Sequence, residues 1–390
     1  MYLTPKEERM HDGEYGWAYQ VSMRILTRLG DLFGATKLIP IQSTHISGVS
    51  YKTIGDASID FLDAIASAGG KVKVPSTLNP SCLDQDHLSQ MEIPQKYREK
   101  QLHIIDLYRK MRINLTFTCT PYYLREPRPG GHLAWAESSA VAYANSVLGA
   151  WTNREGSPSA LASALIGKTP NYGVHQVENR EASILVKVWG NLRNEAEFGA
   201  LGICAGKLLK DKIPFFEGLS NCTSEDLKQL GAGLASSGMA SIFYYHKPYE
   251  KRGLETISIE AKDIENIIES LSTASEAPDL IFIGCPHCSL NEIKSVAQYL
   301  DGKKVREDTK LWICTSRHVK KKAKKYVGII EGAGGYVLCD TCAIVTWIKE
   351  LGIGNMMTNS AKAAYYAPTL NQVNATLAPL SKCVDMVCHR

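Results

Sequence analysis

The sequence predicts an α/β protein made of several three-layer α/β/α units in which most strands are parallel. Short apolar runs that suit strands alternate with longer amphipathic stretches that suit helices, an order typical of parallel sheets. Most of the apolar runs end in small or polar residues, as expected of loops at the carboxyl ends of strands. A length of 390 residues, of which 44% are apolar and 22% charged, is enough for two or three packed units.

The N-terminal third shows this alternation first. Proline and charged residues open a short helix, and a longer stretch then repeats apolar residues at helical spacing. Each strand that follows leads into a polar loop. The expected elements are a helix from Pro5, helices over 15–33, 58–68 and 96–111, and strands over 37–41, 71–74 and 114–117.

The rest of the chain changes composition twice. Residues 125–173 are rich in Gly, Pro, Ser and Ala, and a linker-like stretch over 273–278 precedes the clearest strand–loop–helix unit. In that unit Ser289 and Glu292 form a capping-box pattern at the start of a helix. We expect subdivisions near 1–130, 131–275 and 276–390. The expected elements are helices over 137–148, 257–272 and 291–300, a helix and strand within 223–244, and strands over 279–284, 310–314 and 335–339.

Charge and hydropathy exclude several classes of protein. Lysine and arginine number 44 against 40 acidic residues, a net charge of +4 that is too small and too mixed for a nucleic-acid binder. Residues 317–325 are basic, but Val319, Ala323 and Val327 recur every four residues, which predicts a helix with solvated lysines. No apolar run is long enough to span a membrane, and the polar N-terminus has no secretory signal. The expected location is the cytoplasm.

Eleven cysteines are many for a cytoplasmic chain, and four of them form two CxxC pairs. In a reducing compartment such cysteines indicate buried thiols, reactive thiols or metal ligands before disulfides. The pairs begin at Cys285 and Cys339 and end at Cys288 and Cys342, so together they offer a four-thiolate zinc site. The 51 positions from Cys288 to Cys339 exceed the gap of a compact zinc ribbon.

A different set of cysteines follows expected strands directly. Cys119, Cys285 and Cys342 each lie beyond a strand, beside Thr or Pro. Ligands gather at the carboxyl ends of parallel strands, so three thiolates there could hold three irons of a cubane cluster and leave the fourth open. An open iron is a Lewis acid that binds a hydroxyl and a carboxylate. The alternative, buried thiols without a metal, is equally compatible with these positions.

Several separate motifs point to one family. The opening MYLTPKEERMHDGEYG and the segments HISGVSY, TFTCTPYY, GHLAWAESSAVAYANS, GCPHCS, DTC and TNSAKAAYY resemble the aconitase X family over nearly the whole chain. The resemblance is to the large subunit in particular. It implies an aconitase-superfamily-like fold with its cleft at the carboxyl ends of strands, and a separate small swivelling subunit that supplies a catalytic serine.

The resemblance also implies a chemistry. Family members are hydro-lyases with a [4Fe-4S] cluster that has one open iron, and the ligands would be Cys119, Cys285 and Cys342. One family activity is dehydration of (R)-mevalonate 5-phosphate to trans-anhydromevalonate 5-phosphate in the archaeal modified mevalonate pathway of isoprenoid synthesis. The alternative is dehydration of cis-3-hydroxy-L-proline, and a rival of another class is a non-catalytic zinc-binding interaction protein.

The remaining site residues are likewise implied by the resemblance. Glu137 would act as an acid on the departing hydroxyl, and Lys362 would supply charge to a substrate carboxylate or phosphate. The substrate contacts would fall on Gly48, Val49, Ser50, Asn79, Pro80, Glu137, Ser138 and Lys362.

Overall fold

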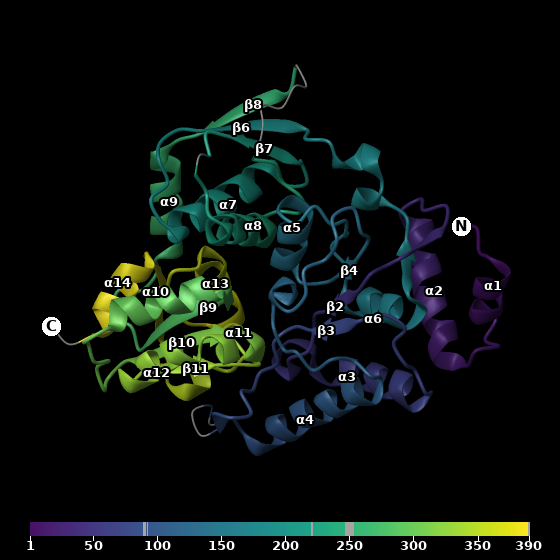
Figure 1. The fold of residues 1–390 in the computed structure, drawn as a ribbon, viewed down its shortest axis with the longest axis horizontal. Helices are drawn as coiled ribbons and strands as arrows, with labels where there is room; N and C mark the ends of the chain where they lie inside the picture. Colours follow the sequence, from purple (N-terminus) through teal and green to yellow (C-terminus); the bar gives the residue numbers. More distant parts are fainter. Residues whose placement is uncertain (89–90, 92, 220, 246–252, 389–390) are drawn as a thin grey trace. The chain divides into compact units, whose positions relative to one another are not determined.

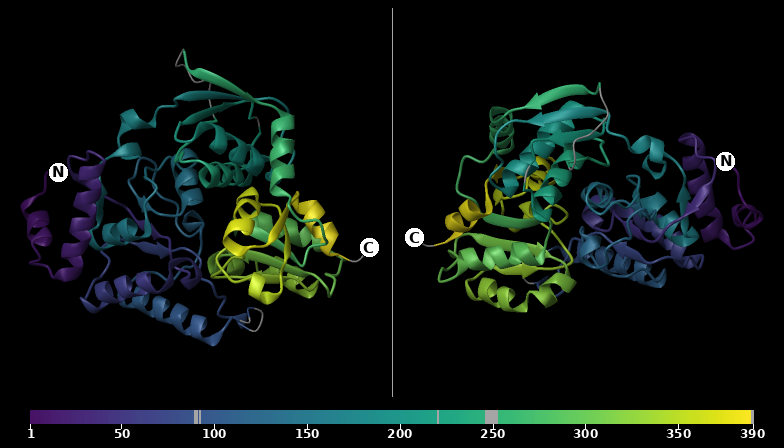
Figure 2. Two further views of the ribbon diagram at one scale, coloured as in Figure 1. Left: turned by 180° about the vertical axis from the view of Figure 1, so that it is seen from behind. Right: turned by 45° about the horizontal axis from the view of Figure 1, so that its top comes forward.

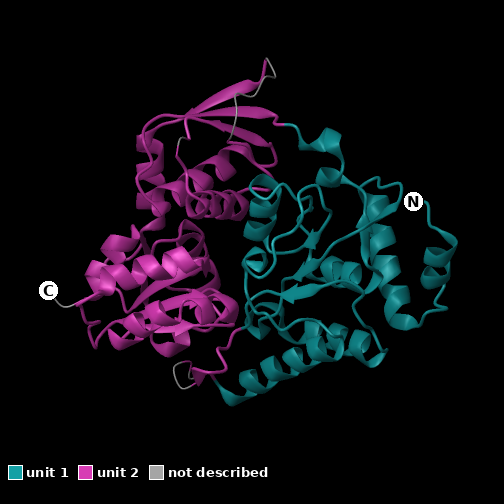
Figure 3. Cartoon of the chain, in the orientation of Figure 1, with its two compact units in different colours: residues 1–81, 94–181 teal, residues 82–93, 182–390 magenta. Residues whose placement is uncertain are grey.

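The computed structural model divides the chain into two compact units (Figure 3). Unit 1 comprises residues 1–81 and 94–181, and unit 2 comprises residues 82–93 and 182–390. Each is described by itself below. The structure describes residues 1–88, 91, 93–219, 221–245 and 253–388.

Unit 1 carries the N-terminal alternation of helices and short strands (Figure 1). The capping box of Thr4 and Glu7 starts the first helix, where Pro5 occupies a position that needs no backbone donor. The helices expected over 15–33, 58–68, 96–111 and 137–148 are all present. The elements are α1 Pro5–His11, α2 Trp17–Leu32, β1 Leu38–Pro40, β2 Thr44–Ile46, α3 Tyr51–Ser67, β3 Ser76–Leu78, α4 Gln95–Lys110, β4 Ala134–Trp135, α5 Ser138–Ser146, α6 Ser157–Ile166 and β5 Lys168–Pro170, with 3-10 turns at Pro121–Tyr123, Gly173–His175 and Val177–Arg180.

The parallel sheet of unit 1 has the strand order β3-β2-β4. The strand expected over 71–74 was misplaced, because the Val72 and Lys73 amides donate to the carbonyls of Met111 and Ala164 at helix ends instead of to a strand. The ladder strand is β3, a few residues later.

Two other strand predictions for unit 1 need correction. The run over 37–41 contains β1, but β1 pairs antiparallel with β5, and the strand that leads into the Ser47–Ser50 loop is β2. Of residues 114–117, only Asn114 forms a bridge, which joins it in parallel to Thr77. Both errors concern short runs whose pairing depends on distant partners.

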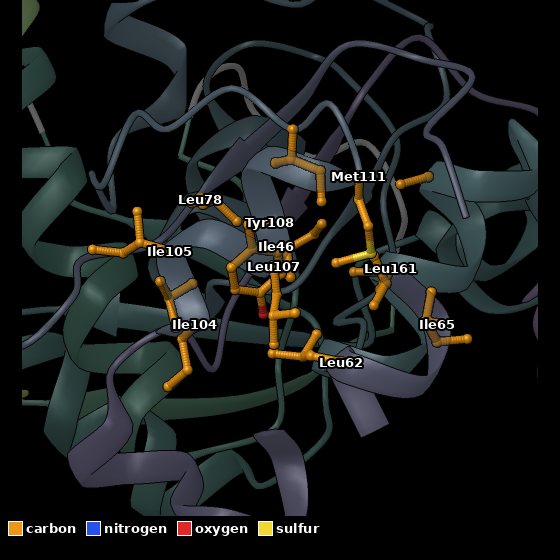
Figure 4. Close-up of a cluster of buried hydrophobic side chains, with 14 of the residues drawn as sticks. Ile46, Leu62, Ile65, Leu78, Ile104, Ile105, Leu107, Tyr108, Met111 and Leu161 are labelled. Carbon is orange, nitrogen blue, oxygen red and sulfur yellow. The ribbon is translucent and has the colours of Figure 1, made fainter. Parts of the chain in front are cut away.

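The core of unit 1 lies between the sheet and helices α3, α4 and α6 (Figure 4). Ile46 and Leu78 enter it from β2 and β3, Tyr108 and Met111 come from α4 and its end, and Leu161 comes from α6; each is at most 2% exposed. This packing fixes the strands whose carboxyl ends carry the expected site residues.

Unit 2 contains two further parallel sheets. One has the order β7-β6-β8, whose strands lie side by side in Figure 2, and the other has the order β11-β10-β9-β12-β13. The elements are β6 Ile184–Val188, α7 Glu195–Leu209, β7 Pro214–Glu217, α8 Ser224–Ser237, β8 Glu255–Ile259, α9 Ala261–Leu271, β9 Leu280–Cys288, α10 Leu290–Leu300, β10 Lys310–Thr315, α11 Arg317–Lys322, α12 Lys324–Gly332, β11 Tyr336–Leu338, β12 Asn355–Thr358, α13 Ala361–Tyr366, β13 Asn374–Leu377 and α14 Leu380–Val387, with a 3-10 turn at Lys349–Leu351 and a π-helical turn at Ala367–Asn371.

The structure confirms some local predictions for unit 2 and corrects others. The Ser289–Glu292 capping box starts α10, and Val319, Ala323 and Val327 are buried beneath the basic helices. The helix expected over 257–272 was drawn too long, because its first residues belong to β8. The loop expected over 285–288 is instead the buried end of β9.

The close pair α7 and α8 was not predicted, and glycines explain it. A Cβ on Gly202 would lie 2.3 Å from the carbonyl oxygen of Leu230, and a Cβ on Gly233 would lie 2.2 Å from that of Gly199. The two helices therefore meet backbone to backbone. Among the described residues, no helix combines the length and the apolar character needed to cross a membrane.

Candidate active site

The sheet of unit 1 brings its expected site residues to one edge. Gly48, Val49 and Ser50 follow β2, Asn79 and Pro80 follow β3, and Glu137 and Ser138 follow β4. These three strands are parallel and in register, so the loops leave from the same end of the sheet.

Buried side chains hold the loop after β2. Gln101 of α4, fully buried, donates from Nε2 to the Val49 carbonyl at 3.0 Å and accepts from the Tyr51 amide at 2.8 Å. The Ser157 hydroxyl donates to the Ser47 carbonyl at 2.7 Å. Gly48 has φ +67, a left-handed conformation that favours glycine. The loop is thus fixed just before the N-terminus of α3, where backbone donors and the helix dipole favour an anion.

Glu137 is held on both carboxylate oxygens. Its Oε2 accepts from Nδ2 of Asn79 at 2.8 Å, and its Oε1 accepts from the Ser139 hydroxyl at 3.0 Å. The side chain is also the N-cap of α5, and the residue is 9% exposed. Two predicted site residues, Asn79 and Glu137, are therefore in direct contact.

Cys119 lies at the same edge of unit 1, although its segment is not the expected strand. The Thr118 amide donates to the Leu78 carbonyl at 2.9 Å, which carries this segment past the end of β3. The Thr118 and Thr120 hydroxyls lie 3.1 Å apart and brace the turn around the thiol. Cys119 is 8% exposed.

In unit 2, the other two expected cluster ligands and Lys362 also lie at the carboxyl ends of strands. Cys285 is in the last part of β9, Cys342 follows β11, and Lys362 is in the first turn of α13, directly after β12. His287 Nε2 lies 3.0 Å from the Thr341 carbonyl, so the two cysteine segments are hydrogen-bonded to each other. Lys362 is half-buried.

A segment from far back in the sequence holds the Cys339–Cys342 loop. Asp84, which is fully buried, accepts from the Cys339 amide at 2.8 Å, and Arg317 binds Asp340 at 2.6 Å and Asp86 at 2.5 Å. Asp340 has φ +63, and burial raises the pKa of its carboxyl to about 6 against the opposing effect of Arg317. These contacts were not predicted from the sequence, because Asp84 and Cys339 are 255 positions apart.

The cysteines differ slightly in accessibility. The three expected ligands are 6–8% exposed, whereas Cys288, Cys339 and Cys314 are at most 2% exposed. Burial raises the pKa of Cys339 to about 12 and that of Cys314 far above its usual value. Metal ligation needs thiolates, so the burial of Cys339 and Cys314 disfavours them as ligands.

The four CxxC cysteines of unit 2 do not form a compact metal-binding group. Within the described ranges, no three His, Cys, Asp or Glu side chains are grouped to hold a metal ion, and this includes the four CxxC cysteines. All eleven cysteines lie among the described residues and none forms a disulfide. Cys119 belongs to unit 1, and Cys285 and Cys342 belong to unit 2.

Comparisons with known proteins give one consistent result. Residues 1–178, 182–269 and 278–389 match the models of the first, second and third domains of aconitase X. The chain is 48% identical to the phosphomevalonate dehydratase large subunit of Methanocaldococcus jannaschii over 95% of this chain and 96% of the relative. It is 44% identical to the large subunit of the same name from Methanothermobacter thermautotrophicus, over 96% of both chains.

More distant relatives and a solved structure extend the comparison. A cis-3-hydroxy-L-proline dehydratase of Hypocrea jecorina is 32% identical over 99% of this chain but only 68% of its own length. The crystal structure of Thermococcus kodakaraensis aconitase X in its holo-form matches with a TM-score of 0.92 and 42% identity, covering 98% of this chain and 99% of that one. Since the domain models, the relatives and the fold agree over almost the full length, this chain belongs to the aconitase X family.

Proposed function

We propose that the chain is the large subunit of a hydro-lyase that dehydrates (R)-mevalonate 5-phosphate to trans-anhydromevalonate 5-phosphate, a step of the modified mevalonate pathway. The observation that carries the proposal is end-to-end similarity to archaeal phosphomevalonate dehydratase large subunits at 44–48% identity. The cis-3-hydroxy-L-proline dehydratase is less similar and extends well beyond the aligned region.

The proposal includes a [4Fe-4S] cluster with one open iron, held by Cys119, Cys285 and Cys342. The family supports an iron–sulfur cluster in general, and each of the three thiols retains 6–8% exposure. When bound, such a cluster supplies a Lewis acid for the substrate hydroxyl and carboxylate.

The three subdivisions of the chain expected near 1–130, 131–275 and 276–390 also remain part of the proposal.

The chain's own residues bind the substrate and move one proton in this scheme. Glu137 in its carboxylic acid form delivers its proton to the hydroxyl that leaves carbon 3 as water, and becomes the carboxylate that accepts from Asn79 and Ser139. Lys362 neutralises an anionic group of the substrate, and the Gly48–Ser50 loop orients another through backbone donors. Pro80 and Ser138 line the same edge. The product keeps the carboxylate and gains a double bond between carbons 2 and 3.

The proton of carbon 2 needs a base from elsewhere. The name large subunit implies a smaller partner for the relatives. We propose that a small swivelling subunit supplies a catalytic serine for this step, so the chain alone should be inactive. Eleven thiols and no disulfide suit a reducing compartment, and the proposal therefore includes a cytoplasmic location.

The decisive experiment uses the full chain purified without oxygen, alone and with its small subunit. We expect a brown protein with about four irons per chain. It should convert mevalonate 5-phosphate to an enoate only in the presence of the partner. Cys119→Ala, Cys285→Ala and Cys342→Ala should lose iron and activity, whereas Cys288→Ala and Cys339→Ala, as neighbouring controls, should retain iron.

Each other outcome has a definite meaning. A brown complex that dehydrates cis-3-hydroxy-L-proline but not mevalonate 5-phosphate would replace the proposed substrate. Full iron content in Cys119→Ala would refute the ligand assignment. A colourless chain with one zinc would refute the dehydratase proposal.

A further inference from the structure

Five side chains share one face of the unit 1 sheet, and they connect its interior to Glu137. His45 of β2 is in register with Thr77 of β3 and Trp135 of β4, and neighbours in register point to the same face. Residues two positions apart on a strand also share a face, which adds Asn79 and Glu137 just beyond the strand ends.

His45 lies in the centre of this face and is fully buried. Its Nδ1 is 2.8 Å from the Thr77 hydroxyl, and its Nε2 is 3.3 Å from Oδ1 of Asn79. The Trp135 ring packs edge-on against the imidazole with centroids 6.2 Å apart. Burial lowers the pKa of His45 to about 4, against the effects of Glu137 and Asn79, so the ring is neutral at neutral pH. A neutral imidazole donates at one nitrogen and accepts at the other.

The neighbouring hydrogen bonds determine which nitrogen donates. Asn79 donates from Nδ2 to the Glu137 carboxylate, so its Oδ1 faces His45 and needs a donor. The Asn79 contact therefore places the proton of the imidazole on Nε2, and Nδ1 is then the acceptor of the Thr77 hydroxyl, whose other acceptor within reach is the Thr44 carbonyl at 3.2 Å. Without the Nε2 donor, the Asn79 amide would lose the contact that keeps its nitrogen turned toward Glu137.

We propose that His45 is a positioning residue for the dehydration: through Asn79 it orients the hydrogen bond that holds the Glu137 carboxylate. This inference rests on the proposed function, because it assumes that Glu137 acts on the substrate. It assigns His45 no contact with the substrate. Its effect should therefore appear in the chemical step more than in substrate binding.

The test compares two amides in the anaerobic holoenzyme complex. His45→Gln places a donor near the position of Nε2, whereas His45→Asn reaches only as far as Nδ1. We expect His45→Asn to lower kcat for mevalonate 5-phosphate about tenfold, the effect of one lost hydrogen bond, with KM changed by less than about threefold. His45→Gln should recover most of kcat, and both variants should keep wild-type iron content.

A surface histidine provides the matched control. His103 also contacts a carboxylate, with Nε2 2.8 Å from Asp63, but on the surface of unit 1. His103→Asn should leave kcat and KM unchanged. Equal kcat values for His45→Asn and His45→Gln would overturn the proposal, as would a loss in His45→Asn that is confined to KM or follows iron content.

A second measurement needs neither activity nor a folded His45 variant. Nitrogen-15 NMR of histidine-labelled wild-type complex reports the tautomer of each imidazole. The His45 signal is identified by its shift in Thr77→Val, a substitution at a residue that borders a cavity of about 310 Å³ and so has room. A neutral ring protonated on Nε2 supports the proposal, and protonation on Nδ1 overturns it. If the wild-type complex does not dehydrate mevalonate 5-phosphate, the proposed function fails, and the tautomer still decides whether His45 orients Asn79.

Discussion

Replacing Gly284 with alanine should displace the strand that carries Cys285. Gly284 has φ +113, in the region that favours glycine, and it precedes the cysteine directly within β9. An added Cβ would lie 2.3 Å from the carbonyl oxygen and 2.9 Å from the amide nitrogen of Cys314 on the neighbouring strand β10. Both atoms belong to the backbone, so no side-chain rotation relieves the contact.

The expected loss of folding stability in Gly284→Ala has two contributions. A left-handed backbone costs about 1–2 kcal/mol for a residue with a Cβ. Forcing an extra carbon into a packed interior costs about 1–3 kcal/mol more. A total of about 3 kcal/mol, in a folding unit of roughly 200 residues, corresponds to a fall in Tm of about 6–12 °C.

Gly302→Ala separates these two parts. Gly302 also has a positive φ, +72, but no heavy atom lies within 4 Å of the position of its added Cβ. It should therefore show only the backbone cost of about 1.5 kcal/mol, a fall in Tm of about 3–6 °C. The assay is thermal unfolding of the intact chain by circular dichroism, with iron content measured in the holoenzyme complex. Gly284→Ala should also lose iron. Equal Tm values for the two variants would refute the steric argument.

Two further predictions concern buried polar groups of unit 1. Burial, His132 and Arg180 lower the pKa of His175 to about 3, below the ordinary 6.5, so His175 contributes stability that is present above pH 6.5 and lost as the pH falls toward 3. That loss approaches about 1.4 kcal/mol per pH unit below pH 6.5. Since His45, with a pKa of about 4, loses a similar amount between pH 6.5 and 4, His175→Leu should roughly halve the part of the fall in Tm that these two histidines cause. Parallel curves for the two proteins would contradict this. Gln101→Leu should remove both hydrogen bonds that hold the Gly48–Ser50 loop and lower the free energy of unfolding by about 2–3 kcal/mol. It should also raise KM in steady-state assays of the holoenzyme complex. An unchanged KM would show that the loop does not position the substrate.

Local chemistry explains which elements the sequence could predict. The Ser289–Glu292 capping box needs only residues three apart, and the structure confirms both hydrogen bonds of the motif. The helix over 96–111 repeats its apolar residues at helical spacing and appears as α4 with little change. Gly48, Asn79 and Glu137 do lie at one sheet edge, but the strands that carry them, β2, β3 and β4, were not the ones expected from the sequence.

The errors come from interactions that no local pattern encodes. Residues 71–74 alternate lysine and valine like a strand, but their amides bond to helix ends 39 and 91 residues away, counting from Val72 to Met111 and from Lys73 to Ala164. The first residues of 257–272 continue an amphipathic pattern, yet pairing with β6 makes them part of β8. In both cases the available hydrogen-bond partners decided the structure, and the propensity of the segment did not.

The contact between Asp84 and the Cys339 amide is the hardest feature of the site to predict from sequence. The chain leaves unit 1 directly after Asn79 and Pro80, and within a few residues Asp84 binds the amide of Cys339 in unit 2. One stretch therefore carries an expected substrate contact at one end and braces the loop of an expected cluster ligand at the other. Only a few residues of backbone, from Asn79 to Asp84, therefore separate the two in sequence. Composition and spacing cannot reveal this contact, since Asp84 has no pattern that distinguishes it from an ordinary surface carboxylate, and only its burial against Cys339 shows its role.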